Sequence, residues 1–100
     1  MDPRTTYDRR NEVQILDVRE PDEWASGHID GAVHIPMNQV PQRLEEVSRD
    51  RPVVAVCHSG RRSGEMADLL RDRGFPAENM PGGMEQWAGE GLPVARPSHR

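Results

Sequence analysis

The chain has 100 residues, of which 34% are hydrophobic, and a net charge of −4 at pH 7. This length suits one small α/β domain, so we expect residues 1–100 to form a single domain. The thirteen basic residues are all arginines and form no basic cluster, which argues against a nucleic-acid partner. No apolar run is long enough to cross a bilayer and no signal peptide opens the chain, which argues against a membrane partner.

The first strand and helix are expected after a polar segment, residues 1–12, which offers only Thr5-Thr6-Tyr7 as a possible short strand. The β-branched run Val13–Val18 predicts a buried strand. A proline followed by two carboxylates favours a helix over Pro21–Ser26, and Gly27 should end it.

The next strand and helix are predicted after the Asp30-Gly31 turn. Ala32–Ile35 is a brief apolar strand that Pro36 cuts off. Asn38 can then cap a helix whose apolar residues recur at helical spacing on one face. These residues are Val40, Leu44 and Val47.

The second half of the chain repeats the alternation of strand and helix. Val53–Val56 is apolar at every position, as expected for a central strand covered on both faces. Helical spacing predicts a helix over Ser63–Arg73 that ends at Gly74. The remaining elements are a short strand within Phe75–Met80, a helix over Met84–Ala88 with Trp87 facing inward, a closing segment Gly91–Val94 and a frayed tail, residues 95–100.

Strands that alternate with helices through short loops indicate a parallel sheet covered by helices on both faces. In such sheets ligands bind at the carboxyl ends of the strands. Cys57, the only cysteine, follows the most buried predicted strand and therefore lies where a site is expected. A single free thiol allows no intramolecular disulfide and suits a reducing compartment, so we expect a cytoplasmic protein.

The residues after Cys57 favour a reactive thiolate. The backbone N–H groups of His58 to Ser63, the start of the following helix, and the cations Arg61 and Arg62 all stabilise negative charge on the sulfur. The same groups would hold an anionic substrate, so His58, Ser59, Gly60, Arg61, Arg62 and Ser63 are the candidate substrate-binding residues. The alternative is that Cys57 is an inert, buried, small hydrophobic residue.

With this loop the chain resembles the rhodanese (sulfurtransferase) family. The loop Cys57–Ser63 fits that family's Cys-x-x-Gly-x-Arg-Ser active-site motif, and three flanking stretches match family motifs in the same order. These stretches are Leu16–Glu20, Gly27–Ala32 with Ile35-Pro36, and Gly82–Trp87 with Gly91–Val94. The resemblance covers about residues 14 to 94. Only the amino terminus departs from it, because the family has a clear first strand and helix there.

The resemblance implies a five-stranded, mostly parallel sheet between helices, and ping-pong sulfur transfer. Cys57 would take the outer sulfur of a donor such as thiosulfate, carry it as a persulfide, and pass it to cyanide or a thiol. Arg62 would fix either the loop or the anionic donor. No cofactor is implied besides the covalent persulfide.

Two other functions are weighed against this one. The chain could be a persulfide carrier or binding module that serves a partner protein. It could also be a phosphatase or arsenate reductase, but cysteine phosphatases need Cys-x5-Arg. Arg62 is only the fifth residue after Cys57, so the loop is one residue shorter and suits a single sulfur atom better.

Several other residues carry two interpretations. Arg61 either attracts a dianionic donor or is a solvated surface arginine, and His58 and Ser59 either contact substrate or are merely exposed. Asp17 and Arg19 either line the site or pair with nearby charges and hold loops in place, and we expect the second. His28 and His34 lack the companions that a metal site needs, so no metal is expected. The residues expected in the core are Trp24, Trp87, Met80 and Met84.

Overall fold

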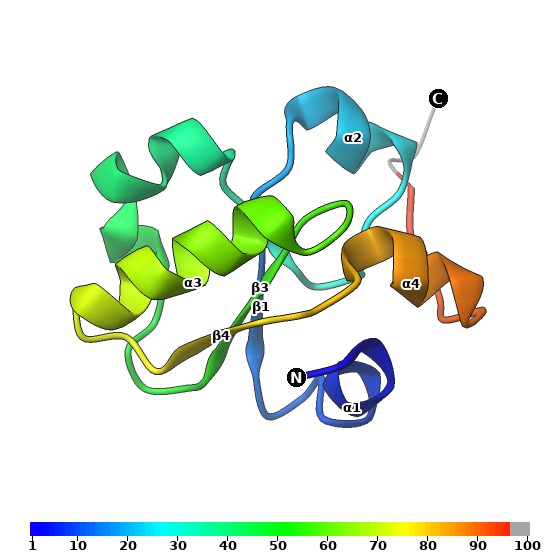
Figure 1. Cartoon of the computed structure of the whole chain (residues 1–100), viewed down its shortest axis with the longest axis horizontal. Coiled ribbons are helices and arrows are strands. Elements are labelled where there is room, and N and C mark those ends of the chain that lie inside the picture. Colours follow the sequence, from blue (N-terminus) through cyan, green and yellow to red (C-terminus); the bar gives the residue numbers. More distant parts are fainter. Residues whose placement is uncertain (97–100) are drawn as a thin grey trace.

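The structure, a computed structural model, describes residues 1–96 and shows a parallel sheet with helices on both of its faces (Figure 1). Its four strands lie in the order β2-β1-β3-β4. They are β1 (Gln14–Asp17), β2 (Val33–His34), β3 (Val53–Val56) and β4 (Ala77–Asn79). The predicted α/β class is confirmed, but the expected fifth strand is absent from the described residues.

The fifth strand is missing because the amino-terminal segment forms a helix, α1 (Pro3–Asp8). Pro3 occupies the first turn, where a missing N–H costs nothing, and the carboxylate of Asp2 accepts a hydrogen bond from the backbone N–H of Thr5 at 2.7 Å. The expectation of a short strand at Thr5-Thr6-Tyr7 was therefore wrong.

The helix predicted after Asn38 was also wrong in type. The segment forms two 3-10 helices, η1 (Met37–Gln42) and η2 (Leu44–Glu46), and Asn38 lies inside the first rather than capping it. Pro41 is inside η1, and a proline there removes a backbone donor that a regular α-helix needs. The apolar face is still used, because Val40 and Val47 are buried.

The other helices agree closely with their predictions. The helix α2 spans Pro21–Ser26 as expected, and α4 (Gly83–Gly89) contains the predicted Met84–Ala88. The longest helix, α3 (Arg61–Asp72), begins two residues before the expected start at Ser63. It begins early because Gly60, with a positive φ of 100°, turns the chain directly into the helix.

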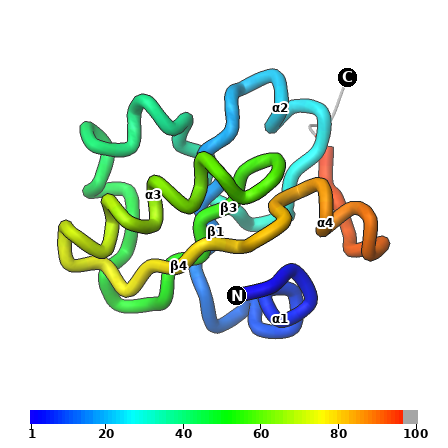
Figure 2. The backbone as a smooth tube through the Cα atoms, viewed as in Figure 1, coloured from blue at the N-terminus to red at the C-terminus, as the bar shows by residue number. Residues whose placement is uncertain are grey.

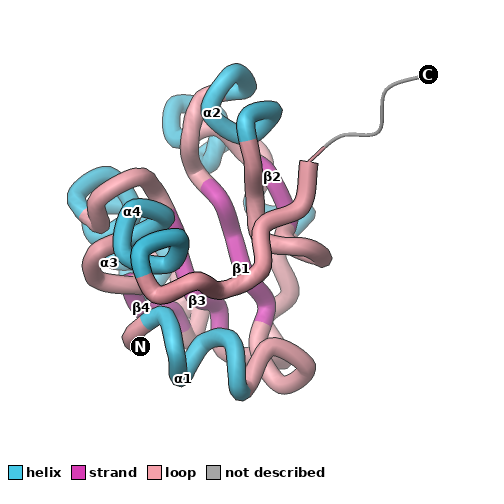
Figure 3. The backbone as a smooth tube through the Cα atoms, turned by 90° about the vertical axis from the view of Figure 1, so that its right-hand side faces the viewer, coloured by secondary structure: helices cyan, strands magenta, loops and turns pink. Residues whose placement is uncertain are grey.

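Two hydrophobic clusters pack against the two faces of the sheet. One joins α3 and the 3-10 helices to residues such as Leu16 and Val53. The other joins α1 and α4 to residues such as Ile15 and Val54. The adjacent positions Ile15 and Leu16 thus point to opposite faces, as strand geometry requires. Figure 3 shows α2 at one end of the strands and α1 at the other.

Most of the expected core residues are confirmed. Trp87, Met80 and Met84 are buried in the cluster with α1 and α4. Trp24 is not part of the core, since it is half-buried and its indole ring stacks on the imidazole rings of His28 and His34.

The predicted tail begins too early. Ala95 forms two backbone hydrogen bonds with His28, at 2.7 and 2.8 Å, and so joins the carboxyl-terminal segment to the rest of the fold. Residues 97–100 of the expected tail lie outside the described part of the chain. Within residues 1–96, no helix has the length and apolar character needed to span a membrane.

Candidate active site

Cys57 lies directly after β3, at the carboxyl-terminal edge of the sheet. Its side chain is only 1% exposed. Its sulfur accepts a hydrogen bond from the backbone N–H of Gly60 at 3.1 Å and lies 3.2 Å from the hydroxyl oxygen of Ser63. Figure 2 shows that the loop after β3 turns between α2 and α4 before it enters α3.

These contacts lower the pKa of Cys57 below its ordinary value. Burial acts in the opposite direction, because it penalises the thiolate. The Ser63 hydroxyl and the backbone N–H groups of Ser63, Gly60 and Ser59 outweigh that penalty by donating to the charged sulfur. The surroundings of Cys57 therefore favour a thiolate, which is the reactive form of cysteine.

The shape of the loop depends on two glycines. A Cβ built at Gly60, the residue that starts α3, would lie 3.0 Å from the backbone nitrogen of Gly82. Gly83 also has a positive φ, and a Cβ there would meet the carbonyl oxygens of Cys57 and His58. Only glycine allows the start of α4 to approach the loop Cys57–Ser63 this closely.

The first turn of α4 uses this close approach to hold the loop in place. The backbone N–H of Met84 donates to the carbonyl of Cys57 at 2.8 Å, and that of Glu85 donates to the carbonyl of His58 at 2.9 Å. The first N–H groups of a helix have no partner within the helix, so they are free to bind the loop. The loop carbonyls are thereby turned towards α4.

Arg62 is held by a bidentate ion pair with Glu23. The two guanidinium nitrogens donate to the two carboxylate oxygens at 2.8 Å each. This hydrogen-bonded pair lowers the pKa of Glu23 from 4.5 to about 2. The pair directs these two donors at α2 and joins the start of α3 to that helix.

The remaining polar loop residues lie at the surface. Ser59 and Arg61 are exposed, and so is His58, whose imidazole Nε2 lies 3.2 Å from a carboxylate oxygen of Glu85. The structure thus places these three residues at the mouth of the loop, around the more deeply buried sulfur.

Asp17 and Arg19 form the buried ion pair that was expected of them. The Arg19 guanidinium donates to the Asp17 carboxylate, with a shortest distance of 2.8 Å, and to the carbonyls of Glu23 and Gly27. Arg19 therefore joins the end of β1 to both ends of the α2 segment.

Sequence reasoning missed three partners of the loop: Glu23, Glu85 and Asn79. Asn79 lies at the end of β4, and its side chain contacts Ser63 and Gly60. The only advance signal for Glu23 is its place in the acidic first turn of α2. The sequence contains no such signal for Asn79 and Glu85, because their contacts depend on how β4 and α4 approach the loop.

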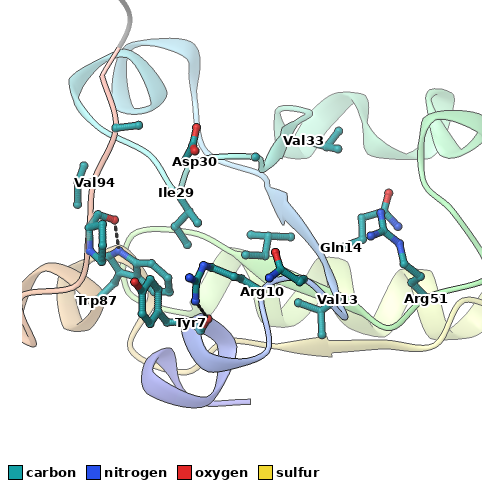
Figure 4. Close-up of a pocket in the computed structure, with 15 residues that line it drawn as sticks. Tyr7, Arg10, Val13, Gln14, Ile29, Asp30, Val33, Arg51, Trp87 and Val94 are labelled. Atoms are coloured by element: carbon teal, nitrogen blue, oxygen red, sulfur yellow. Dashed lines mark hydrogen bonds between the residues drawn. The ribbon is translucent and has the colours of Figure 1, made fainter.

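One cavity lies apart from the loop. It has a volume of about 750 Å³ and is lined by side chains that include Tyr7, Arg10, Asp30 and Trp87 (Figure 4). None of residues 57–63 lines it. A smaller cleft of about 390 Å³ does reach the loop, where His58 forms part of its wall.

Within residues 1–96, no group of three or more His, Cys, Asp or Glu side chains is placed to hold a metal ion. The imidazole nitrogens Nδ1 of His28 and Nε2 of His34 instead donate to the backbone carbonyl oxygens of Trp24 and Arg19, at 3.0 and 2.8 Å.

Comparison with known proteins gives a consistent match over most of the chain. The family model described as "Rhodanese-like domain" matches residues 3–90. The "Putative sulfurtransferase YtwF" of Bacillus subtilis is 42% identical over 82 residues, which cover 82% of this chain and 80% of that protein. The "Thiosulfate sulfurtransferase GlpE" of Pseudomonas aeruginosa is 35% identical over 80 residues, which cover 79% of this chain and 73% of that protein.

Solved structures match as well. The crystal structure of a rhodanese-related protein from Thermoplasma volcanium aligns with a TM-score of 0.93 at 28% identity, over 97% of each chain. Similarity therefore extends to α1, where the sequence motifs found no counterpart. Sulfur transfer is the activity that the names of both relatives share.

Proposed function

The chain belongs to the rhodanese-like domain family, and on that premise we propose that it is a sulfurtransferase acting through a persulfide on Cys57. The donor is a sulfane-sulfur compound such as thiosulfate, and the acceptor is cyanide or a thiol. The observation that carries the proposal is the Cys57 sulfur, which is buried yet hydrogen-bonded by the Gly60 amide and beside the Ser63 hydroxyl. These groups lower the pKa of the thiol, so the thiolate nucleophile forms more readily and the reaction needs no general base.

In the first half-reaction the Cys57 thiolate attacks the outer sulfur of thiosulfate. A sulfur–sulfur bond to Cys57 forms, the bond inside thiosulfate breaks, and sulfite leaves with its electron pair. In the second half-reaction the acceptor attacks the outer sulfur of the persulfide. That bond breaks, the product leaves with the transferred sulfur, and the Cys57 thiolate is regenerated.

The loop supplies binding as well as activation. His58, Ser59 and Arg61 surround the mouth and would contact the donor, while Gly60 and Ser63 hold the sulfur. Arg62 fixes the loop through Glu23. A loop one residue shorter than Cys-x5-Arg leaves less room for a phosphoryl group, so we expect no turnover of an aryl phosphate or of arsenate. A reducing compartment such as the cytoplasm would keep the thiol free.

Mass spectrometry of the intact protein tests the proposal. Incubation with thiosulfate should add the mass of one sulfur atom to the wild type and nothing to Cys57→Ala. Later addition of cyanide should remove that mass and release thiocyanate. No adduct with any of several sulfane donors would refute the proposal.

The same experiment separates an enzyme from a carrier. A persulfide that forms but is not removed by cyanide or by small thiols would favour the carrier function, in which a partner protein accepts the sulfur. A pull-down from a sulfide-stressed lysate, with Cys57→Ala as the control, would then identify that partner.

A further inference from the structure

The hydroxyl group of Ser63 lies between two acceptors. Its oxygen is 3.2 Å from the Cys57 sulfur and 2.5 Å from the amide oxygen Oδ1 of Asn79. A serine hydroxyl carries a single proton, so it can donate to only one of these groups at a time. Ser63 is buried, and no second donor on its side chain can satisfy the other acceptor.

The orientation of the Asn79 amide is fixed by its other contact. The nitrogen Nδ2 donates to the carbonyl oxygen of Gly60 at 3.0 Å. A carbonyl only accepts, so Nδ2 must face Gly60 and Oδ1 must face Ser63. Rotating the amide by half a turn would place two oxygen atoms together at Gly60. Asn79 therefore presents an acceptor to Ser63.

The two protonation states of Cys57 are then unequal in their hydrogen bonds. With a neutral thiol, the S–H group donates to the Ser63 oxygen, and Ser63 donates to Asn79, so each group is satisfied. With a thiolate, the Ser63 proton must turn to the sulfur, and two oxygen acceptors then face each other at 2.5 Å. Otherwise the Ser63 hydroxyl continues to donate to Asn79, and the thiolate loses this hydrogen bond.

We propose that Asn79 is a positioning residue that competes with the Cys57 sulfur for the Ser63 proton and so limits how readily the thiolate forms. Asn79 does not touch the sulfur; it acts through Ser63. The other groups that donate to the Cys57 sulfur, such as the Gly60 N–H, favour the thiolate, and Asn79 opposes it. A slower formation of the thiolate would also slow sulfur transfer. This step rests on the proposed function, which takes Cys57 as the reactive thiol.

The charged groups around the loop do not account for the opposition to thiolate formation that we assign to Asn79. Arg62 at the start of α3 is paired with Glu23 on α2, and the buried Arg19 beyond β1 is paired with Asp17. At the mouth, His58 lies beside Glu85 of α4, and Arg61 is exposed. Asn79 is an uncharged residue of β4, and it contacts both Ser63 and Gly60.

Titration of the thiolate by its ultraviolet absorbance tests the proposal on the purified chain. Cys57 is the only cysteine, so the signal reports one group, and a parallel titration of Cys57→Ser removes the contribution of Tyr7. Asn79→Ala should lower the pKa of Cys57 by roughly half a unit to one unit, the worth of about one hydrogen bond. Ser63→Ala should raise it.

A variant lacking both side chains gives the decisive comparison. In the Ser63→Ala background, Asn79→Ala should no longer lower the pKa, because no shared proton remains. If Asn79 merely supported Gly60, its loss would loosen the Gly60 N–H and raise the pKa of Cys57, or leave it unchanged. Either of those results would overturn the proposal.

Two features keep the test independent of other failures. Asn79→Leu retains the volume of the side chain without its acceptor, and it should also lower the pKa of Cys57. It replaces the alanine variant in the test if that variant does not fold. The titration uses no sulfur donor. Failure of persulfide formation would therefore count against the proposed function and leave the role of Asn79 to be judged from the pKa alone.

Discussion

The guanidinium of Arg62 and the carboxylate of Glu23 form a two-pronged ion pair, with both nitrogen–oxygen distances at 2.8 Å. The pair joins the first turn of α3 to the first turn of α2. Bidentate pairs of this kind fix direction as well as distance. The loop that holds Cys57 is therefore anchored by α2 on one side and by the amides of α4 on the other.

Replacement of this carboxylate, Glu23→Gln, should destabilise the protein by about 1–2 kcal/mol at pH 7, since the pair is partly open to solvent. The pKa of Glu23 is about 2 in the folded protein and 4.5 ordinarily. The stabilisation from the ionised carboxylate is therefore complete above pH 4.5 and is lost as the pH falls towards 2. Urea unfolding of both proteins at several pH values should show their difference narrowing over that range. The control is Asp22→Asn, which removes a neighbouring exposed carboxylate and should change the free energy of unfolding little. A difference in unfolding free energy between wild type and Glu23→Gln that does not depend on pH would contradict the prediction.

The buried pair of Asp17 and Arg19 should matter more for stability. Their side chains are 1% and 5% exposed, so Asp17→Asn leaves a buried guanidinium without its counter-charge. We expect a loss of about 3 kcal/mol, measured by urea unfolding. The control is Glu12→Gln, which breaks an exposed pair with Arg9 and should cost no more than about 0.5 kcal/mol. Equal losses in the two variants would show that burial of the pair is unimportant.

The sequence was sufficient for the elements whose cause is local. Val53–Val56 and Pro21–Ser26 occur as predicted, because a β-branched run and a proline followed by carboxylates act within a few residues. The errors arose where neighbouring signals conflicted. Pro41 turned an apparently regular helix into 3-10 turns, and the cap at Asp2 outweighed the strand tendency of Thr5-Thr6-Tyr7.

The centre of the candidate site was predictable, but its surroundings were not. Cys57 and its loop are contiguous in sequence, so their motif and length could be read directly. Glu23 lies 39 residues before Arg62, and Asn79 lies 16 residues after Ser63. Such contacts depend on strand order and on the approach of α2 and β4 to the loop. Pattern and spacing within the loop carry no information about them.

A methyl group at Gly83 should disturb the loop Cys57–Ser63. Its Cβ would lie 2.4 Å from the carbonyl oxygen of Cys57, and the φ of 55° is unfavourable for other residues. We expect Gly83→Ala to cost about 2–4 kcal/mol in stability and to raise the pKa of Cys57 as the loop moves. Gly89→Ala, in the same helix with no atom within 4 Å of its Cβ, should be neutral or slightly stabilising. Thermal unfolding of both variants checks this, and equal melting temperatures would contradict it.

The two functions considered for Arg61 can be separated by kinetics. It is an exposed cation at the mouth of the loop, whereas Arg62 is neutralised by Glu23. If Arg61 attracts a dianionic donor, Arg61→Gln should lower kcat/KM for thiosulfate roughly 3–10-fold, mainly through KM, and weaken the dependence of kcat/KM on salt. Arg4→Gln removes the same charge from the exposed face of α1, far from the loop in sequence, and is the matched control. A similar small change in both variants would assign Arg61 to the solvated surface, because only the net charge would then matter.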